Sequence, residues 1–408
     1  GMIKQQFEIP AGYKKWTYGL LAVGIVAFIA GFIFLGMSKN EHDQTRFWAV
    51  LLQNSVYFLL VCNAAMFFIC AITLAHGGWS VAFRRVPEAI SAVVPVFAIL
   101  AFLVFLGLIL GHRHDIYHWV DKEAVAHDKI LTWKKGFLNP TFFFIWTIIT
   151  LCVWTFTGMK MRKLSRKADE GPMSAEDAKR YTWNNTVWAA IFVVFFALTV
   201  GSTIPWLWLM SLDAHWYSTM YSWYTFASTF VAGIALIALF IIFLKNHGYL
   251  EYTTREQLHD VGKFIFAFSI FWTYLWFSQF MLIWYANIPE ETIYFKIRFQ
   301  GPYRGFFFLN FIINFCAPIL ILMTKGSKRN YAVMTFMSVA VILGHWLDFY
   351  QMVMPSTVGE NHNLGWFEWG ILALYIGMIM FFTGRALTKA PLVAKYHPYL
   401  KESIIHHT

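Results

Sequence analysis

The chain has 408 residues, of which 58% are apolar and only 13% are charged, and it contains 42 Phe and 19 Trp. A globular domain is nearer half apolar and a quarter charged, and so few charges could not cover the surface of a soluble fold of this length. Disorder is also excluded, because disordered chains are poor in aromatic residues. The composition therefore predicts an all-α polytopic membrane protein. Its net charge of +10 is then best explained by cationic loops on one membrane face rather than by nucleic-acid binding.

Ten apolar runs are long enough to cross the hydrocarbon core, which takes about 20 residues of helix. No Lys or Arg lies deep inside any of them, and the first run is too long for the core of a signal peptide. The sequence therefore predicts ten transmembrane helices in a single membrane domain. They cover approximately 16–37, 47–76, 89–111, 140–160, 184–210, 220–244, 264–286, 305–324, 331–353 and 365–384.

The basic residues predict the orientation of these helices. With ten spans both termini lie on one side, and that side carries 22 of the 32 Lys and Arg residues. Basic residues concentrate in cytoplasmic loops, so we expect both termini to be cytoplasmic. No connection is long enough to form a separate domain, and any soluble redox partner must therefore be another subunit.

Cysteine spacing gives no sign of a redox centre. The four cysteines lie inside apolar runs and form neither Cys-x-x-Cys nor Cys-x-x-Cys-His, which argues against a zinc ribbon, an iron–sulfur cluster and covalently attached haem. We expect these side chains to be small buried hydrophobes.

The longest outer connection, about 112–139, is rich in histidine, tryptophan and charge. His-rich tracts can bind metals, but a lone His-x-His is a weak ligand pattern. An interfacial loop that docks on a partner explains the composition better, so we expect no metal site. The residues concerned are His112, His114, Asp115, His118, Trp119 and His127.

His345 and Asp348 are the strongest chemical signal in the sequence. They lie in the ninth run, within Gly344–Gln351, and the i,i+3 spacing puts both on one helical face. Ionisable side chains in the bilayer are expensive and usually functional, and a carboxylate beside an imidazole can share a proton. The pair is therefore a predicted proton path, and the alternative is a hydrogen-bonded pair that holds two helices together.

A second Asp–His pair, Asp213 and His215, lies in the short outer turn Ser211–Tyr221. A proton path and a capped helix start with interfacial aromatic residues explain this turn equally well. Asp-x-His-Trp at the end of the fifth span echoes His-Trp-x-Asp in the ninth. The echo indicates two parallel four-helix units, spans two to five and six to nine, rather than an inverted repeat.

Further polar residues extend these hypotheses towards both membrane faces. On the outer side they suggest a proton path or part of a quinone pocket. On the inner side, Glu88 follows Pro87 and also suits a helix N-terminus. The remaining proton-path candidates are Glu368, His76 and Glu88, and the quinone or polar-path candidates are Gln279, Asn287 and Tyr350.

Three stretches, Ser211–Ser218, Phe277–Glu291 and His345–Gln351, resemble a membrane anchor of alternative complex III, the bacterial quinol:cytochrome c oxidoreductase. This anchor belongs to the NrfD/polysulfide-reductase superfamily, and the second stretch is similar to the smaller anchor family, ActF. The resemblance implies two four-helix bundles, approximately 47–210 and 220–353, flanked by two helices.

The same resemblance implies a location in the bacterial inner membrane and a set of partners. These are a multihaem cytochrome c subunit, an iron–sulfur subunit, a homologous sister anchor, small lipid-anchored or single-span subunits, a terminal cytochrome oxidase in some organisms, and membrane lipid. It further implies a proton path in this anchor and no electron carrier of its own. Quinone or quinol is the one small molecule that the resemblance suggests.

Two alternatives remain at the level of the sequence. A ten-helix secondary transporter would need broken helices near the midplane, usually in an inverted repeat. Pro95, Pro205 and Pro318 are the residues that could break helices, but they show no paired pattern. The other alternative is a purely structural membrane anchor of a redox complex.

Overall fold

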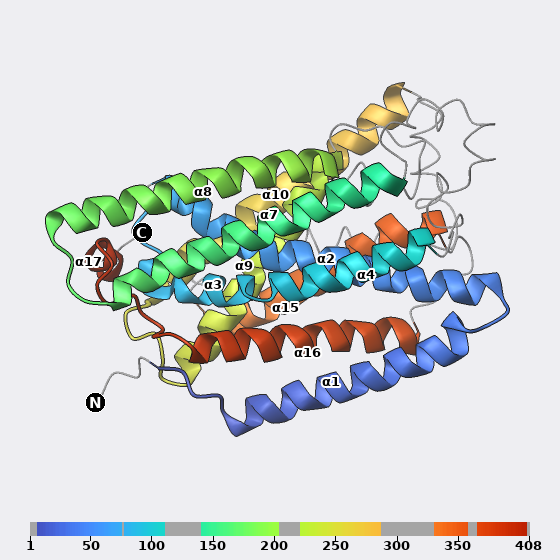
Figure 1. Ribbon diagram of the computed structural model, residues 1–408, viewed down its shortest axis with the longest axis horizontal. Helices are drawn as coiled ribbons and strands as arrows, with labels where there is room; N and C mark the ends of the chain where they lie inside the picture. The colour runs from blue at the N-terminus through green and yellow to red at the C-terminus, as the bar shows by residue number, and fades with distance from the viewer. Residues whose placement is uncertain are drawn as a thin grey trace.

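The computed structural model describes residues 6–75, 77–110, 140–203, 221–286, 330–357 and 365–405. Within these ranges every regular element is a helix, and the long helices run roughly along one axis of the molecule (Figure 1). A membrane favours this architecture, because a helix satisfies its own backbone hydrogen bonds where no water is present.

The elements follow one another along the chain with short turns at several of their ends. A π-helical turn, Phe32–Gly36, extends the first helix, and short 3₁₀ turns lie at Val81–Phe83 and Lys167–Asp169. The helices are α1 (Ala11–Gly31), α2 (Glu41–Leu74), α3 (Arg85–Ser91), α4 (Val94–Leu110), α7 (Pro140–Arg166), α8 (Ala175–Thr203), α9 (Tyr221–Asn246), α10 (Arg255–Ala286), α15 (Tyr331–Thr357), α16 (Trp366–Thr388) and α17 (Leu400–Ile404).

Eight helical segments in the described part of the chain are long and apolar enough to cross a membrane. They coincide with eight of the ten expected spans. The expected span 264–286 lies in α10, which is helical over 32 residues but is not one of the eight, and the span 305–324 lies outside the described residues. The prediction of an all-α multi-pass membrane protein is confirmed, whereas the number ten stays a prediction.

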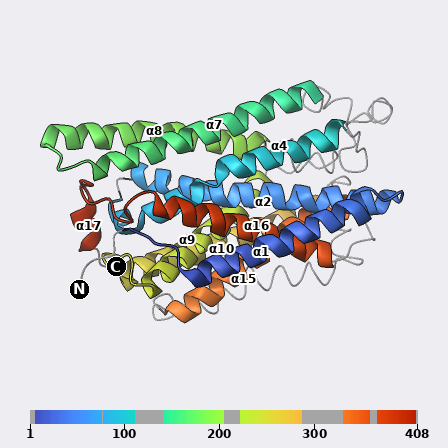
Figure 2. The same cartoon turned by 60° about the horizontal axis from the view of Figure 1, so that its bottom comes forward.

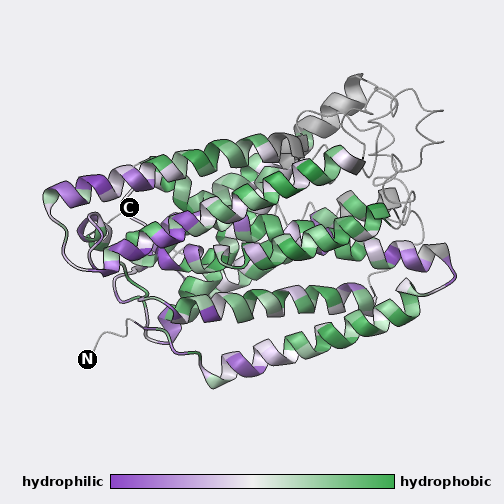
Figure 3. Cartoon of the chain, in the orientation of Figure 1, coloured by the Kyte–Doolittle hydropathy of each residue, from purple (hydrophilic) through white to green (hydrophobic). Residues whose placement is uncertain are grey.

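Helices α2 and α9 form the centre of the molecule. In their apolar stretches 83% of the residues are buried, compared with 22% in α1. Helix α2 packs against α4, α8, α9 and α15, while α9 packs against α10 and α15. The outer helices carry many exposed apolar side chains, and Figure 3 shows a broad apolar belt along the helices, with more polar residues at the end where the N and C labels lie. Such a belt suits contact with lipid rather than water.

One end of the molecule collects both ends of the chain, and we call it the terminal end (Figures 1 and 2). There the amide nitrogen of Gln257 donates to the carbonyl oxygens of Trp79 and Ser403, at 2.9 and 2.8 Å. The backbone of Tyr396 likewise donates to Ala168, at 3.0 Å. These bonds tie separate segments of the chain together, so the arrangement agrees with the expectation that both termini share a side.

The expected span 89–111 is not one continuous helix. Helix α3 ends at Ser91 and α4 begins at Val94, with Pro95 in the first turn of α4. Proline fits at such a position because it has no N–H group to lose there. Of the three prolines that could break helices, Pro95 therefore marks a real interruption, and Pro205 and Pro318 lie outside the described residues.

Glycines bring α1 and α16 into close contact. A Cβ atom added at Gly24 would lie 2.4 Å from the Cα and Cβ atoms of Leu374, and one added at Gly370 would lie 2.2 Å from the Cβ of Ala27. Small residues at such contacts let membrane helices approach closely. The two helices that flank the rest of the chain therefore pack directly on each other.

The expectation that the cysteines are buried is confirmed for two of the three that the structure describes. Cys62 and Cys70 are buried free thiols, whereas Cys152 on α7 is exposed. Helix α7 lies at the outside of the molecule, so its apolar surface, including this thiol, is available to lipid.

Candidate functional site

The predicted site residues divide into those that the structure describes and those that it does not. His345, Asp348 and Tyr350 lie buried on α15, Glu368 lies buried at the start of α16, and Glu88 lies buried on α3. His76, Asp213, His215 and Asn287 lie outside the described residues. Gln279 falls within α10, but the structure does not describe its side chain.

His345 and Asp348 form a buried polar cluster together with Ser228 on α9 and Trp272 on α10. We call it the relay cluster, after the proton path that the sequence predicts there. The hydroxyl oxygen of Ser228 lies 2.8 Å from His345 Nδ1 and 2.8 Å from Asp348 Oδ2. Trp272 Nε1 donates to the same carboxylate oxygen at 3.1 Å. Nδ1 of His345 and Oδ2 of Asp348 are 3.8 Å apart, too far for a direct hydrogen bond. The serine hydroxyl is therefore the bridge between them.

The bridge restricts where protons can reside. A hydroxyl has one proton to donate. If Ser228 donates it to Asp348, then His345 must carry a proton on Nδ1 in order to donate to the serine. If the imidazole gives up that proton, Ser228 can donate to His345 only when Asp348 is protonated. The two states differ by a concerted shift of two protons, which moves one net proton between imidazole and carboxylate.

The other side of the imidazole has an open hydrogen-bonding position. Nε2 of His345 is buried and has no hydrogen-bond partner among the described residues. The ring packs edge-on against the indole of Trp272, with centroids 5.5 Å apart. Buried polar atoms of this kind usually have a partner or a function, so Nε2 is the atom through which a proton could enter or leave the cluster.

Helix α2 holds α15 in register on both sides of His345. Gln53 donates to the carbonyl of Trp346 at 3.1 Å, Asn54 accepts from the Trp346 indole at 2.9 Å, and Tyr57 donates to the carbonyl of Ile342 at 2.6 Å. All three side chains are buried. These bonds position the relay cluster, and they are of the kind that joins membrane helices.

Glu368 lies in a different environment from Asp348. Its two carboxylate oxygens accept from Nε and Nη2 of Arg46, both at 2.6 Å, and one of them also accepts from the backbone N–H of Gly365 at 2.9 Å. The carboxylate thus caps α16 and pairs α16 with α2. This geometry explains Glu368 as a structural group, while its predicted place in a proton path stays untested.

Glu88 belongs to a buried ion-pair network at the terminal end. Its carboxylate lies 3.2 Å from Arg84 Nε and 3.6 Å from Arg85 Nε. Glu88 also lies in the first turn of α3, as the helix-start interpretation expected. The two guanidinium groups hold this carboxylate in ion pairs, which gives Glu88 a structural role. Its predicted role in proton entry stays a prediction.

His397 closes the same network from the C-terminal segment. Its Nε2 lies 3.4 Å from Arg84 Nη1, and its Nδ1 accepts from the backbone N–H of Tyr399 at 3.0 Å. Burial, together with the charges of Arg84 and Arg85, holds the pKa of His397 well below its ordinary value. The imidazole is therefore neutral at physiological pH.

Sequence reasoning found one half of each of these arrangements. It identified His345 and Asp348 but not Ser228 or Trp272, and it identified Glu88 but not its ion pairs with Arg84 and Arg85. The available signal was weak, because a serine in an apolar run is common in membrane helices and the two arginines lie within a predicted loop. Only the packing of distant helices reveals Ser228 and Trp272, whereas Arg84 and Arg85 lie four and three residues before Glu88, so their spacing was a signal that could have found them.

A cavity of about 680 Å³ lies nearer the terminal end, between α1, α2, α9, α15 and α16. Its walls are apolar, and the polar groups at its edge include Tyr13 and His247, each of which bonds a backbone carbonyl, at 2.5 and 2.9 Å. Its size and lining fit a quinone tail. Tyr350, the only predicted quinone residue with a described side chain, does not line it, so a headgroup site beside the relay cluster stays a prediction.

No group of three or more metal-ligating side chains lies within the part of the chain that the structure describes. The His-rich connection 112–139 falls outside that part, so the expectation of no metal site there is not tested.

A scan against protein-family models and a search of curated proteins found no match to this chain. The fold and the site together define an all-α, multi-pass membrane protein with an ionisable cluster buried between its helices.

Proposed function

We propose that this chain is a membrane subunit of a respiratory quinol:cytochrome c oxidoreductase of the alternative complex III type, and that it carries protons through the relay cluster. The observation that carries the proposal is the Ser228 bridge between His345 and Asp348. Burying the ionisable pair His345 and Asp348 among membrane helices is energetically costly. The Ser228 hydroxyl provides a hydrogen-bonded route for a proton between the two side chains. The resemblance of three stretches of the sequence to that family supplies the class of complex.

The relay step involves only groups of this chain. A proton that arrives at Nε2 makes His345 an imidazolium. Its Nδ1 proton passes to the Ser228 oxygen as the serine proton passes to Oδ2 of Asp348, which leaves a neutral imidazole and a carboxylic acid. The acid then loses its proton to a further acceptor. Quinol oxidation releases protons that need such a route, and the oxidation itself would take place in a partner subunit.

Two buried hydroxyls suggest where the path continues towards the terminal end. Ser269 lies one turn from Trp272 on α10, and Ser338 lies two turns from His345 on α15. Both are fully buried, and neither hydroxyl has a hydrogen-bond partner among the described residues. Buried hydroxyls of this kind commonly bind ordered water, which can pass protons.

The proposed architecture is two parallel four-helix bundles with α1 and α16 as the flanking pair. Contacts of α2 with α4 and α8, of α7 with α4 and α8, and of α9 with α10 and α15 support it, as does the packing of α1 on α16. We place the protein in the bacterial inner membrane with both termini cytoplasmic. The proposed partners are a multihaem cytochrome c, an iron–sulfur subunit, a sister anchor and small lipid-anchored or single-span subunits.

The interruption between α3 and α4 does not favour the transporter alternative. Helix α3 has seven residues, so the interruption lies roughly 10 Å from its start. The bilayer midplane lies about 15 Å from either face of the hydrocarbon core. Transporter sites occur at paired interruptions near that midplane, and this break carries only Ala92 and Val93.

Replacing Ser228 by Ala tests the proposed function directly. The change removes the bridge and leaves His345 and Asp348 in place, so we expect quinol:cytochrome c turnover per assembled complex to fall by roughly 10²-fold, the lower end for positioned proton transfer. Thr229→Val is the matched control, because it removes a buried hydroxyl of the same helix that bonds the carbonyls of Thr225 and Phe226.

The outcomes separate the competing functions. Slow turnover for Ser228→Ala with normal turnover for Thr229→Val supports the relay. Normal turnover for both leaves a structural anchor as the better explanation. Purification in mild detergent tests the class of complex, since co-purified haem c and iron–sulfur subunits are expected and their absence would exclude it.

A further inference from the structure

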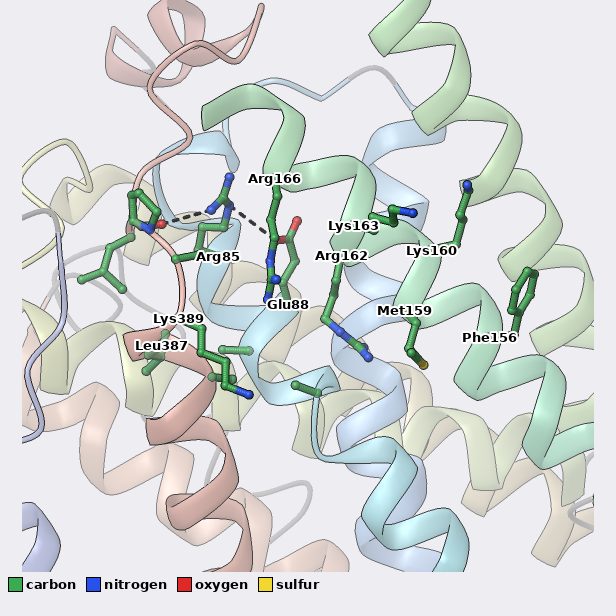
Figure 4. Close-up of a pocket in the computed structure, with 16 residues that line it drawn as sticks. Arg85, Glu88, Phe156, Met159, Lys160, Arg162, Lys163, Arg166, Leu387 and Lys389 are labelled. Atoms are coloured by element: carbon green, nitrogen blue, oxygen red, sulfur yellow. Dashed lines mark hydrogen bonds and ion pairs between the residues drawn. The ribbon is translucent and has the colours of Figure 1, made fainter. Parts of the chain in front are cut away.

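A cationic cavity of about 710 Å³ lies near the terminal end, between α3, α7, α16 and the segment that follows α16 (Figure 4). It is separate from the relay cluster and shares no residue with it. Six basic side chains and one acidic side chain, Glu88, line the cavity, so it carries a strong excess of positive charge. The basic residues are Arg85, Lys160, Arg162, Lys163, Arg166 and Lys389.

The back wall of the cavity is already neutralised. Arg85 lies 2.9 Å from Asp169 and 3.6 Å from Glu88, and it donates to the backbone carbonyls of Pro391 and Ser165 at 3.2 and 3.0 Å. These bonds use Arg85 to join α3, α7 and the segment after α16. Its charge is balanced within the protein, so Arg85 forms a fixed wall rather than a free binding group.

The positive charges of the other five basic side chains are not neutralised in this way. None of them forms an ion pair with a residue in the described ranges. Arg162 is held by its donation to the Ser91 carbonyl and hydroxyl at 3.2 and 3.1 Å, and Lys160 lies over the ring of Trp188 at 5.5 Å. Figure 4 shows the α7 side chains along successive turns of that helix, with Lys389 on the α16 side of the cavity. The arrangement calls for an anionic ligand.

The cavity also has an apolar lip that faces the membrane belt. Phe156 and Met159 line it, and they are 60% and 53% exposed. They lie on α7 about two turns and one turn before Lys163, towards the apolar part of that helix. A soluble phosphate would contact the basic side chains but not the apolar lip. A lipid would contact both, because its phosphate headgroup can bind the basic side chains and its acyl chains can pack against the lip.

We propose that this cavity binds an anionic phospholipid, with the headgroup phosphate between α7 and Lys389 and the acyl chains against Phe156 and Met159. Basic pockets between transmembrane helices are suited to such headgroups. Lys163 and Arg166 are exposed and lie at the rim, so they contact the headgroup while Arg162 forms the inner side of the site. This inference does not depend on the proposed respiratory function.

The test compares lipid binding by the full-length protein and two charge-matched variants. Lys163→Gln/Arg166→Gln removes two cations of the cavity. The control, Lys14→Gln/Lys15→Gln, removes two exposed cations of α1 at the same end of the molecule, away from the cavity. All proteins are purified in mild detergent and titrated with phosphatidylglycerol, with cardiolipin and with phosphatidylcholine, and binding is followed by thermal stability and by native mass spectrometry.

We expect phosphatidylglycerol or cardiolipin, and not phosphatidylcholine, to bind and stabilise the unaltered protein and the control variant. The affinity of the cavity variant should fall roughly 30-fold, since each basic residue near an anionic headgroup contributes about 1 kcal/mol. Equal effects of all three lipids, or equal losses in both variants, would overturn the proposal. Stabilisation by inorganic phosphate alone would assign the site to a soluble anion instead.

Discussion

Asp348, Glu368 and Glu88 are buried carboxylates with different partners, and the partners determine what each one can do. Asp348 accepts from a serine hydroxyl and an indole N–H, two neutral donors that tolerate either protonation state. Glu368 and Glu88 face guanidinium groups, which form strong, charge-assisted contacts with them. Asp348 is therefore the carboxylate of the three that is suited to exchanging a proton, whereas the other two are suited to holding helices together.

The Arg46–Glu368 pair provides a prediction at the residue scale. The side chain of Glu368 is 1% exposed, so replacing Arg46 by Gln leaves a buried carboxylate without its cation. We expect this change to destabilise the fold by about 3–5 kcal/mol, the usual cost of removing one partner of a buried pair. Unfolding in mild detergent measures it. The double variant Arg46→Gln/Glu368→Gln should be less destabilised than Arg46→Gln, and strictly additive losses would contradict the pairing.

His397 predicts a dependence of stability on pH. Its pKa is lowered in the folded protein and is about 6.5 in an unfolded chain, so the unfolded state binds a proton first as the pH falls. Stability is therefore constant above about pH 6.5 and decreases below it, by at most about 1.4 kcal/mol per pH unit from this group. His397→Asn should flatten that part of the profile. An unchanged slope between pH 7.5 and 5.5 would show that His397 is not responsible.

The chemistry of single residues could be predicted from the sequence only where the partners are close along the chain. His345 and Asp348 are three residues apart, and helical geometry alone puts them on one face. Ser228 precedes His345 by 117 residues, and nothing in the local pattern links the two. Their contact depends on how α9 packs against α15, and hydropathy does not encode that orientation.

At the scale of elements, the pairing of α1 with α16 depends on glycine rather than on large apolar side chains. In lipid there is no hydrophobic driving force between helices, so association depends on close packing. Gly24 permits contact with the backbone of Leu374, and Gly370 permits contact with Ala27. Since α1 makes many of its contacts with α16, this interface is what keeps the first helix on the molecule.

Gly24→Ala tests this interface. The added methyl would lie 2.4 Å from Leu374, so we expect overpacking to cost about 1–3 kcal/mol. Gly19→Ala on the same helix is the control, because a Cβ there has nothing within 4 Å and alanine is the better helix former by about 1 kcal/mol. Thermal unfolding should shift down for Gly24→Ala and stay level or rise for Gly19→Ala. Equal shifts would contradict the close contact.

Hydropathy was sufficient to predict the positions of most of the described helices but not their details. Apolar runs of about 20 residues are diagnostic of membrane helices, and eight of the expected spans coincide with such helices. Pro95 pointed to a possible break in the third span, but the exact gap at Ala92–Val93 could not be located, because the run 89–111 stays apolar across it. The helical extension of α10 back to Arg255 was missed for the opposite reason, since its first residues are polar.

At the scale of the whole molecule, the terminal end combines buried ion pairs, several chain segments and the cationic cavity. The opposite end of the described structure carries the Arg46–Glu368 pair and lies nearer the relay cluster, since Ser228 is seven residues from the start of α9. This asymmetry agrees with the excess of basic residues on the side of the termini. The difference between the two ends is compatible with a subunit that has one orientation in the membrane and carries protons in one direction.

Reporter fusions test the orientation. We expect a fusion at the C-terminus to be active only as a cytoplasmic reporter, because the predicted ten-span topology puts 22 of the 32 basic residues on the side of the termini. A fusion in the connection 112–139 serves as the opposite-side control and should be active only as a periplasmic reporter. Periplasmic activity of the C-terminal fusion would invert the topology.

Turnover of an assembled complex that carries Asp348→Asn is the most direct test of the relay. The amide keeps the size of the side chain, and its oxygen can still accept from Ser228 and Trp272, but it cannot take up a proton. We predict that turnover falls roughly 10²- to 10⁴-fold, that assembly is retained, and that His345→Gln combined with it is little worse than either change alone. Normal turnover in assembled complexes with Asp348→Asn and with His345→Gln would contradict the account.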